Sequence, residues 1–187
     1  MDVLLVGHGG REAALAWRLM RCASLGTLYV AGRNPGWPDG VHYRQASGVD
    51  AIVECATSLA VDLVVVGPEA PLAQGLADRL SSVGIPCFGP QRAAATLEAS
   101  KSFAKEVMAS VNVPTAAALV VEVNTPEGLQ AAQRRCQHGD VVLKADGLAA
   151  GKGVFVCPSP EDALEALDTI TSGRFGDAAE RLVLEDL

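Results

Sequence analysis

A glycine-rich turn near the start of the chain has the residue types that hold a phosphate group. Residues 7–12 read GHGGRE and stand between a short apolar run at 3–6 and a helical pattern at 11–21. Backbone N–H groups at the start of such a helix, together with the positive end of its dipole, accept a phosphate. The turn therefore predicts a phosphate site, and the simplest alternative is a tight turn that binds no ligand.

The same turn departs from the fingerprint of a dinucleotide-binding domain. That fingerprint, G-x-G-x-x-G, requires glycine where Glu12 stands, and no acidic residue closes the second apolar run at 28–31 to hold a ribose hydroxyl. Arg33 follows this run and could hold a 2′-phosphate. An NADP-binding Rossmann domain is therefore a further alternative.

A second loop, GPEAPL at 67–72, follows the most continuously apolar run of the chain at 63–66. Open α/β sheets bind ligands at the carboxyl edge of their strands, so we expect Glu69 to face the same crevice as the first turn. A carboxylate there suits ribose hydroxyls or an amino group, while Pro68 and Pro71 stiffen the loop. The alternative is a glutamate that only favours a helix N-terminus.

A second glycine run, KADGLAAGKGV, occupies residues 144–154. A P-loop needs G-x-x-x-x-G-K followed by Ser or Thr and a helix, whereas here one spacer is missing, Gly153 replaces the hydroxyl and a strand follows. Strand, loop and strand predict a hairpin that folds over nucleotide phosphates, with Lys144 and Lys152 supplying positive charge. We expect residues 146–153 to have few fixed contacts and to be mobile without nucleotide. A solvated hairpin tip is the alternative.

The overall composition disfavours several classes of function. The chain has 187 residues, of which 49% are hydrophobic and 20% charged, as in an ordinary globular protein. Its formal charge of −7 and its aromatic content of 4% argue against nucleic acid as a partner and favour small-molecule ligands. No apolar run is long enough for a membrane helix and the N-terminus has no basic signal region, so we expect a cytoplasmic protein without membrane contact.

The cysteines and histidines show no metal-ligand spacing. We expect the five scattered cysteines to be small buried apolar residues in a reducing compartment: Cys22, Cys55, Cys87, Cys136 and Cys157. The three histidines lie far apart in the sequence: His8, His42 and His138. We therefore expect no zinc site.

Two series of elements must position these residues. In the first, apolar runs alternate with helical patterns, which predicts a parallel sheet with helices on both faces. The expected strands are 3–6, 28–31, 63–66 and 85–88, and the expected helices are 11–21, 51–59 and 71–83, with a loop at 32–40. A polar helix at 93–109 leads to the second series, so we place the domain boundary near residue 99.

The second series predicts a small antiparallel α+β lobe. Its expected strands are 119–123, 141–145, 154–157 and 182–185, and its helices are 126–136, capped by Thr125, and 160–170. The fold class is therefore α/β, with one domain at 1–99 and a smaller lobe at 100–187.

Four motifs, in this order and at these separations, resemble a known family: GHGGREAALAW, VVVGPEAPL, LEASKSFAK and LKADGLAAGKGV. Together they are similar to those of the phosphoribosylamine-glycine ligases, the glycinamide ribonucleotide synthetases of purine biosynthesis, over the whole chain. The resemblance implies a pre-ATP-grasp, Rossmann-like domain that holds phosphoribosylamine at 1–99 and the small lobe of an ATP-grasp domain at 100–187. The implied enzyme is an ATP-dependent carbon-nitrogen ligase, which activates glycine as an acyl phosphate for attack by the phosphoribosylamine nitrogen.

The resemblance also implies roles for individual residues. The substrate phosphoribosylamine would contact Gly9, Gly10, Arg11, Glu12 and Glu69. The ATP phosphates would meet Lys101 and Lys144, and the flexible loop would consist of Gly151, Lys152 and Gly153. Glu185 and Leu187 would meet the nucleoside, and no residue is assigned a catalytic role.

The sequence departs from the family pattern at three places. Ala13 stands where the family motif usually has histidine, and residues 31–37 alter the usual P-G-N-x-G-T pattern. The third departure is that the family's large ATP-grasp lobe, its glycine site and its carboxylates for Mg²⁺ or Mn²⁺ would all follow Leu187. The resemblance therefore implies no metal ligand within these residues.

This third departure carries two expectations. We expect the 187 residues alone to form no product, and a non-catalytic module that binds phosphoribosyl or adenine nucleotide ligands is the alternative. We also expect the strand at 182–184 to expose an apolar side. Such a side would favour self-association or association with a chain that supplies the large lobe.

Overall fold

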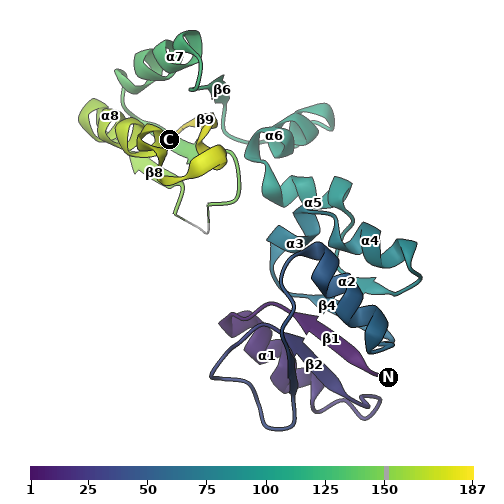
Figure 1. The fold of residues 1–187 in the computed structure, drawn as a ribbon. Coiled ribbons are helices and arrows are strands. Elements are labelled where there is room, and N and C mark those ends of the chain that lie inside the picture. The colour runs from purple at the N-terminus through teal and green to yellow at the C-terminus, as the bar shows by residue number, and fades with distance from the viewer. Residues whose placement is uncertain (150–151) are drawn as a thin grey trace. The chain divides into compact units, whose positions relative to one another are not determined.

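A computed structural model describes residues 1–149 and 152–187 of the chain. They divide into two units, Met1–Ala95 and Thr96–Leu187. The helix α5 (Arg92–Ala99) spans the division between the two units. Each unit has a sheet of its own, as Figure 1 shows. Each unit also has a buried apolar core of its own.

The first unit is built on a five-stranded parallel sheet with the strand order β3-β2-β1-β4-β5, which confirms the predicted parallel architecture. Its strands are β1 (Val3–Val6), β2 (Leu28–Ala31), β3 (His42–Arg44), β4 (Leu63–Val66) and β5 (Cys87–Phe88). The central strand β1 pairs with β2 on one side and with β4 on the other. The chain therefore reverses its winding direction at β1, where open sheets of this kind form ligand crevices.

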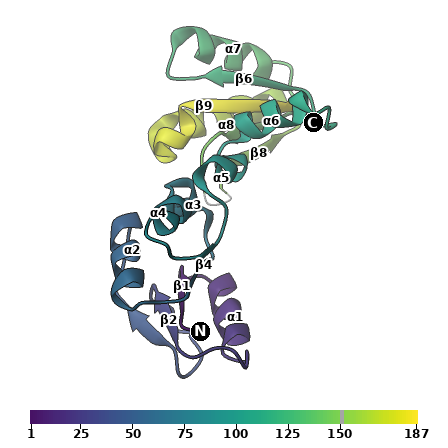
Figure 2. The ribbon, with the colours of Figure 1, turned by 90° about the vertical axis from the view of Figure 1, so that its right-hand side faces the viewer.

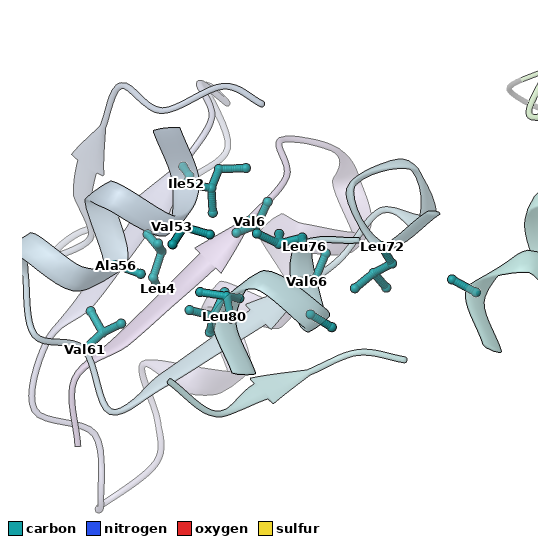
Figure 3. Close-up of a cluster of buried hydrophobic side chains, with 14 residues drawn as sticks. Leu4, Val6, Ile52, Val53, Ala56, Val61, Val66, Leu72, Leu76 and Leu80 are labelled. Atoms are coloured by element: carbon teal, nitrogen blue, oxygen red, sulfur yellow. The ribbon is translucent and has the colours of Figure 1, made fainter. Parts of the chain in front are cut away.

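Helices cover both faces of this sheet, as the sequence pattern predicts. They are α1 (Gly10–Leu19) on one face, and α2 (Val49–Ser58), α3 (Glu69–Ala73) and α4 (Leu76–Ser82) on the other. Figure 2 shows α1 and α2 on opposite sides of the strands. Because side chains alternate along a strand, Leu4 packs with Leu80 in the core of the α2 and α4 side, as Figure 3 shows, whereas Leu5 packs with Ala16 of α1.

The first unit differs from the sequence expectation in two elements. The helix expected at 71–83 is two helices, α3 and α4, because Gly75 adopts a left-handed conformation with φ of +90° between them. The loop expected at 32–40 is followed by β3, an exposed and polar edge strand whose composition has no apolar run. The spacing of apolar residues gives no sign of either feature, so a prediction made from that spacing misses both.

The second unit contains a four-stranded antiparallel sheet with the order β6-β9-β7-β8, as predicted. Its strands are β6 (Ala118–Glu122), β7 (Val141–Ala145), β8 (Val154–Cys157) and β9 (Arg181–Asp186). One face packs against α7 (Pro126–Cys136) and α8 (Pro160–Thr169), whose N-caps are Thr125 and Ser159. The short helices η1 (Ile170–Arg174) and η2 (Gly176–Ala179) lead from α8 to β9. The helix expected at 93–109 ends at Ala99, and α6 (Lys101–Ser110) begins anew after the extended cap residue Ser100.

The strand β9 contradicts the expectation of an exposed apolar side. Leu182 and Val183 are completely buried and Leu184 is 1% exposed. The reason is that helices cover β9 on both faces of the sheet: Leu182 and Leu184 lie in the core with α7 and α8, and α6 packs on the opposite face. The strand is also an interior one, paired with β6 and β7. This strand therefore offers no apolar surface for self-association.

The cysteines are less uniformly buried than expected. Cys136 and Cys157 lie in the core of the second unit, whereas Cys22, Cys55 and Cys87 are half-buried. All five are free thiols. Burial raises the pKa of Cys136 to about 11, so this thiol stays protonated at neutral pH.

Candidate functional site

The turn after β1 is organised around one buried carboxylate. Glu12 is the third residue of α1 and is only 3% exposed, and its Oε2 accepts a hydrogen bond of 2.6 Å from the backbone N–H of Gly9, the N-cap residue. This reciprocal contact is the glutamate half of a capping box. It fixes the turn. The remaining first-turn N–H groups, on Gly10, Arg11 and Glu12, have no partner within the helix.

Two glycines make room for this carboxylate. A Cβ on Gly7 would lie 2.7 Å from Glu12 Cγ, and one on Gly67 would lie 2.6 Å from Glu12 Cδ. Gly7 also has a φ of +118°, a conformation that other residues rarely adopt. The backbone N–H of Gly67 donates to the carbonyl of Val6, so the turns after β1 and β4 are directly joined.

Arg11 links the same carboxylate to the second predicted loop. Its Nε lies 3.1 Å from Glu12 Oε1, and its guanidinium lies 3.5 Å from Glu69 Oε2. The hydrogen bond that Arg11 donates to Glu12 raises the pKa of Arg11 above its already high value. The Arg11 side chain is 62% exposed, so an anion in solution can reach its guanidinium.

The loop after β2 supports the turn after β1 through Asn34, which the sequence analysis did not single out. Its Nδ2 donates to the carbonyls of His8, at 2.8 Å, and Gly9, at 3.0 Å, and its Oδ1 accepts from the Gly36 N–H. The Asn-Pro-Gly sequence at 34–36 is an Asx-turn signal that was available. Although residues 31–37 depart from the family pattern, they include Asn34, whose side chain holds the turn.

In the second unit, α6 covers only part of the sheet face opposite α7 and α8. This face has two rows of cross-strand neighbours, Ala118-Glu185-Val142-Val156 and Val120-Val183-Lys144-Val154. Val154 and Val156 are 45% and 62% exposed. Lys144 therefore stands beside exposed valines on this face, an arrangement that suits a planar base beside a phosphate.

Lys144 is paired with Glu185, the neighbouring residue in the other row. The distance from Lys144 Nζ to Glu185 Oε2 is 2.5 Å, and Lys105 Nζ of α6 lies 3.0 Å from Glu185 Oε1. Burial acts to raise the pKa of Glu185, but hydrogen bonds from Lys144 and Lys105 outweigh it and hold this pKa below its usual value. Glu185 is therefore ionised at neutral pH.

Lys101, at the start of α6, contacts the base of the glycine hairpin. Its Nζ donates to the carbonyls of Ala145, at 2.7 Å, and Gly147, at 3.1 Å. Burial lowers the pKa of Lys101, although Asp146 opposes this shift. These two carbonyls occupy two of the three N–H donors of the ammonium.

Asp146 is a buried anchor that the sequence analysis also did not single out. Its carboxylate accepts from the backbone N–H of Ser102, at 2.7 Å, and from the Ser102 hydroxyl, at 2.6 Å. The Gly153 carbonyl accepts from the Ala145 N–H, at 2.8 Å. The two ends of the segment, Asp146 and Gly153, are thus held by hydrogen bonds, which is more contact than expected at these two residues. Residues 150–151 lie outside the described residues, and mobility of the segment without nucleotide stays a prediction. The Ser-Lys-Ser spacing at 100–102, typical of a helix N-cap, was the available signal.

The predicted site residues fall into two groups. The first unit brings together Gly9, Gly10, Arg11, Glu12 and Glu69 at the start of α1, through one hydrogen bond and two ion pairs. The second unit brings Lys144 and Glu185 together and places Lys101 and Gly153 at the hairpin ends, while Lys152 is exposed. Leu187 follows β9, with its N–H donated to the Asp140 carbonyl, and Gly151 lies outside the described residues. Their contacts with ligands stay predictions.

Two further features concern metals and membranes. Over residues 1–149 and 152–187 there is no group of three or more His, Cys, Asp or Glu side chains that could hold a metal ion. Within the same residues, no helix is both long and apolar enough to pass through a membrane.

Comparison with known families gives two matches that together cover the chain. Residues 1–98 match the model of the phosphoribosylglycinamide synthetase N domain, and residues 99–187 match that of the phosphoribosylglycinamide synthetase ATP-grasp (A) domain. The order of the two matches is the order of the two predicted parts.

Individual proteins of this family are similar to the whole of this chain, which corresponds to part of their own length. The phosphoribosylamine-glycine ligase of Brucella melitensis is 48% identical over 100% of this chain and 43% of its own length, and that of Vibrio cholerae is 40% identical over 100% and 44%. The chain thus spans less than half the length of these relatives.

Solved structures show the same fold. The crystal structure of the Thermotoga maritima phosphoribosylamine-glycine ligase aligns with a TM-score of 0.75 and 26% identity over 100% of this chain and 44% of that chain. The D-alanyl-alanine synthetase A of Vibrio cholerae, at 16% identity, shares the fold alone, with a TM-score of 0.71 over 100% of this chain and 59% of that chain. The chain therefore belongs to the phosphoribosylglycinamide synthetase family, with an N domain followed by ATP-grasp sequence.

Proposed function

We propose that the chain supplies two parts of a phosphoribosylamine-glycine ligase: the phosphoribosylamine-binding domain, residues 1–99, and the small nucleotide-binding lobe, residues 100–187. The reaction converts ATP, glycine and 5-phosphoribosylamine into glycinamide ribonucleotide, ADP and phosphate. A glycine carboxylate oxygen attacks the γ-phosphorus and ADP leaves. The amine nitrogen then attacks the acyl carbon, loses a proton, and phosphate leaves.

The observation that carries this proposal is the arrangement around Glu12. Its carboxylate is turned into the protein, so the outer side of the turn presents the backbone N–H groups of Gly10 and Arg11 and the exposed Arg11 guanidinium. These groups suit a sugar phosphate. Glu69 lies within 3.5 Å of Arg11 and offers an acceptor for the amine or hydroxyls of the same sugar.

The open sheet face of the second unit supports a nucleotide as the other ligand. Val154 and Val156 offer apolar contact to a base, and Lys144 offers a cation to the phosphates. The hairpin at 146–153 follows the same strand, β7, and Lys101 of α6 donates hydrogen bonds to its base. ATP is therefore the proposed co-substrate.

The family implies Mg²⁺ or Mn²⁺ as a cofactor, but the described residues do not fit a metal site of their own, because no three candidate ligands gather among them. No step is assigned to a metal on these residues. The proposed partners are small molecules, since the charge of −7 disfavours nucleic acid. The five free thiols support a reducing cytoplasmic location.

Calorimetric titration of the chain with ribose 5-phosphate, ATP and NADPH, each alone, tests the proposal. Arg11→Met should weaken ribose 5-phosphate binding about fivefold to tenfold, because one exposed charge contact contributes on the order of 1 kcal/mol. Lys144→Met should weaken ATP binding and leave ribose 5-phosphate binding unchanged. Arg18→Met removes an exposed cation from the same helix, α1, away from the turn, and is the matched control.

The three ligands separate the alternatives. Binding of ribose 5-phosphate and ATP at independent sites, each sensitive to its own variant, is the expected result. Binding of NADPH without binding of ribose 5-phosphate would identify a dinucleotide domain and overturn the proposal. Equal effects of Arg11→Met and Arg18→Met would remove Arg11 from the phosphate site.

A further inference from the structure

The ammonium of Lys105 is almost entirely enclosed by protein acceptors. It lies 3.0 Å from Glu185 Oε1 and donates to Thr115 Oγ1, at 2.8 Å, and to the Ala116 carbonyl, at 2.7 Å. The side chain is 12% exposed. A lysine ammonium has three N–H donors, and these acceptors occupy all three. Lys105 therefore has no donor left for a ligand.

Glu185 stands between this enclosed lysine and a more accessible one. Its Oε1 faces Lys105 and its Oε2 faces Lys144, and its side chain is 13% exposed. The Lys144 side chain is 24% exposed and lies beside Val154 on the open sheet face. Of the two cations that hold the carboxylate, Lys144 is thus the one that a ligand can reach.

A nucleotide phosphate that attracts Lys144 competes with Glu185 for it. If Lys144 were the only cation on Glu185, its departure would leave a nearly buried carboxylate without a counter-charge, which is strongly unfavourable. Lys105 removes this obstacle, because it remains on Oε1 when Lys144 leaves Oε2. The two lysines therefore have different functions although they contact the same carboxylate.

We propose that Lys105 is a positioning residue, which keeps Glu185 charge-compensated so that Lys144 can turn from Glu185 to a nucleotide phosphate. The inference deepens the proposed function and rests on ATP binding at this sheet face. It predicts that Lys105 affects binding of the phosphates through Glu185 and not through contact of its own. Binding of adenosine, which has no phosphate, should not depend on Lys105.

A double-mutant cycle on the full chain tests this pathway. In calorimetric titrations, Lys105→Met should weaken ATP binding about tenfold and change adenosine binding less than about twofold, because only the phosphates require Lys144 to move. In the Glu185→Gln background, Lys105→Met should have no further effect on ATP binding, because a neutral amide needs no counter-charge. Lys105→Arg, which keeps the charge, should preserve most of the affinity.

Two controls separate this role from a structural one. Thr115→Val removes one hydrogen bond of the same ammonium at an exposed residue without changing the charge on Glu185, and should leave ATP affinity unchanged. Thermal melting of every variant identifies those that fail to fold. If Lys105→Met fails to fold, the ATP affinities of Lys105→Arg and Thr115→Val are compared instead. The inference would be overturned if Lys105→Met weakened ATP binding equally in the unmodified and Glu185→Gln backgrounds. It would also be overturned if Lys105→Met weakened adenosine binding as much as ATP binding. Absence of ATP binding to the unmodified chain would instead refute the proposed function.

Discussion

Replacement of Gly67 by alanine is expected to displace the buried carboxylate of Glu12 and to destabilise the first unit. A Cβ at this position would lie 2.6 Å from Glu12 Cδ, well inside the contact distance of two carbon atoms. Gly67 is not in the left-handed region, so alanine adds no backbone strain. The whole effect therefore comes from the contact with Glu12.

The size of the effect follows from the two ways in which the clash can be relieved. If Glu12 stays, overpacking costs about 1–3 kcal/mol. If Glu12 leaves, the charge-assisted hydrogen bond from the Gly9 N–H is lost, which costs about 1.5–3 kcal/mol. Either route lowers the free energy of unfolding by about 2 kcal/mol.

Urea unfolding followed by tryptophan fluorescence measures this loss. The chain has two tryptophans, Trp17 and Trp37, and both lie in the unit Met1–Ala95, so the signal reports that unit alone. Gly10→Ala is the matched control, because a Cβ at Gly10 meets nothing within 4 Å and alanine favours the helix by up to about 1 kcal/mol.

A second background identifies the cause. In a Glu12→Ala chain the obstructing side chain is absent, so Gly67→Ala should cost less than about 1 kcal/mol. The reasoning is refuted if Gly67→Ala is as stable as the unmodified chain, or if its cost is the same with and without Glu12.

Three further results are expected. Gly10→Val should abolish ribose 5-phosphate binding in calorimetry, because it blocks approach of the phosphate, while the urea midpoint changes little. The lowered pKa of Glu185 contributes stability that is present above its ordinary pKa of 4.5 and is lost as the pH falls through the folded-state pKa, so thermal melts of Glu185→Gln should lack this acid-induced loss. In a thiol-reagent assay at pH 8, Cys136 and Cys157 should react only after unfolding, whereas the half-buried Cys22 should react in the folded chain.

Periodicity predicted most strands and helices because burial follows it closely. Leu63–Val66 is a continuous apolar run and is an interior strand. Periodicity failed where one residue breaks the backbone while the apolar spacing continues across it. Gly75 in its left-handed conformation and Ser100 in an extended one each divide a single predicted helix into two.

The site was predicted less completely than the fold, because a motif identifies residues but not the direction of their side chains. The motif match placed Glu12 among the substrate contacts, and the structure shows its carboxylate buried under the turn. Direct contact between Glu12 and substrate stays a prediction. The signal for its buried position was the pair Gly7 and Gly67, since two glycines from different strands leave space for one side chain between them.

An acidic chain can bind anionic ligands if its carboxylates near the site are buried and paired within the protein. This is the arrangement of Glu12, Asp146 and Glu185. Each carboxylate is buried or nearly so and is satisfied from within, by the Gly9 N–H, by Ser102 and by two lysines, respectively. The more accessible groups beside Glu12 and Glu185 are cations, Arg11 and Lys144. Most of the charges that make up the net charge of −7 lie further from a bound ligand than one Debye length, about 8 Å, so salt screens their effect on the ligand. Within hydrogen-bond distance the local cation dominates, so the net negative charge of the chain does not prevent a small anionic ligand from binding there.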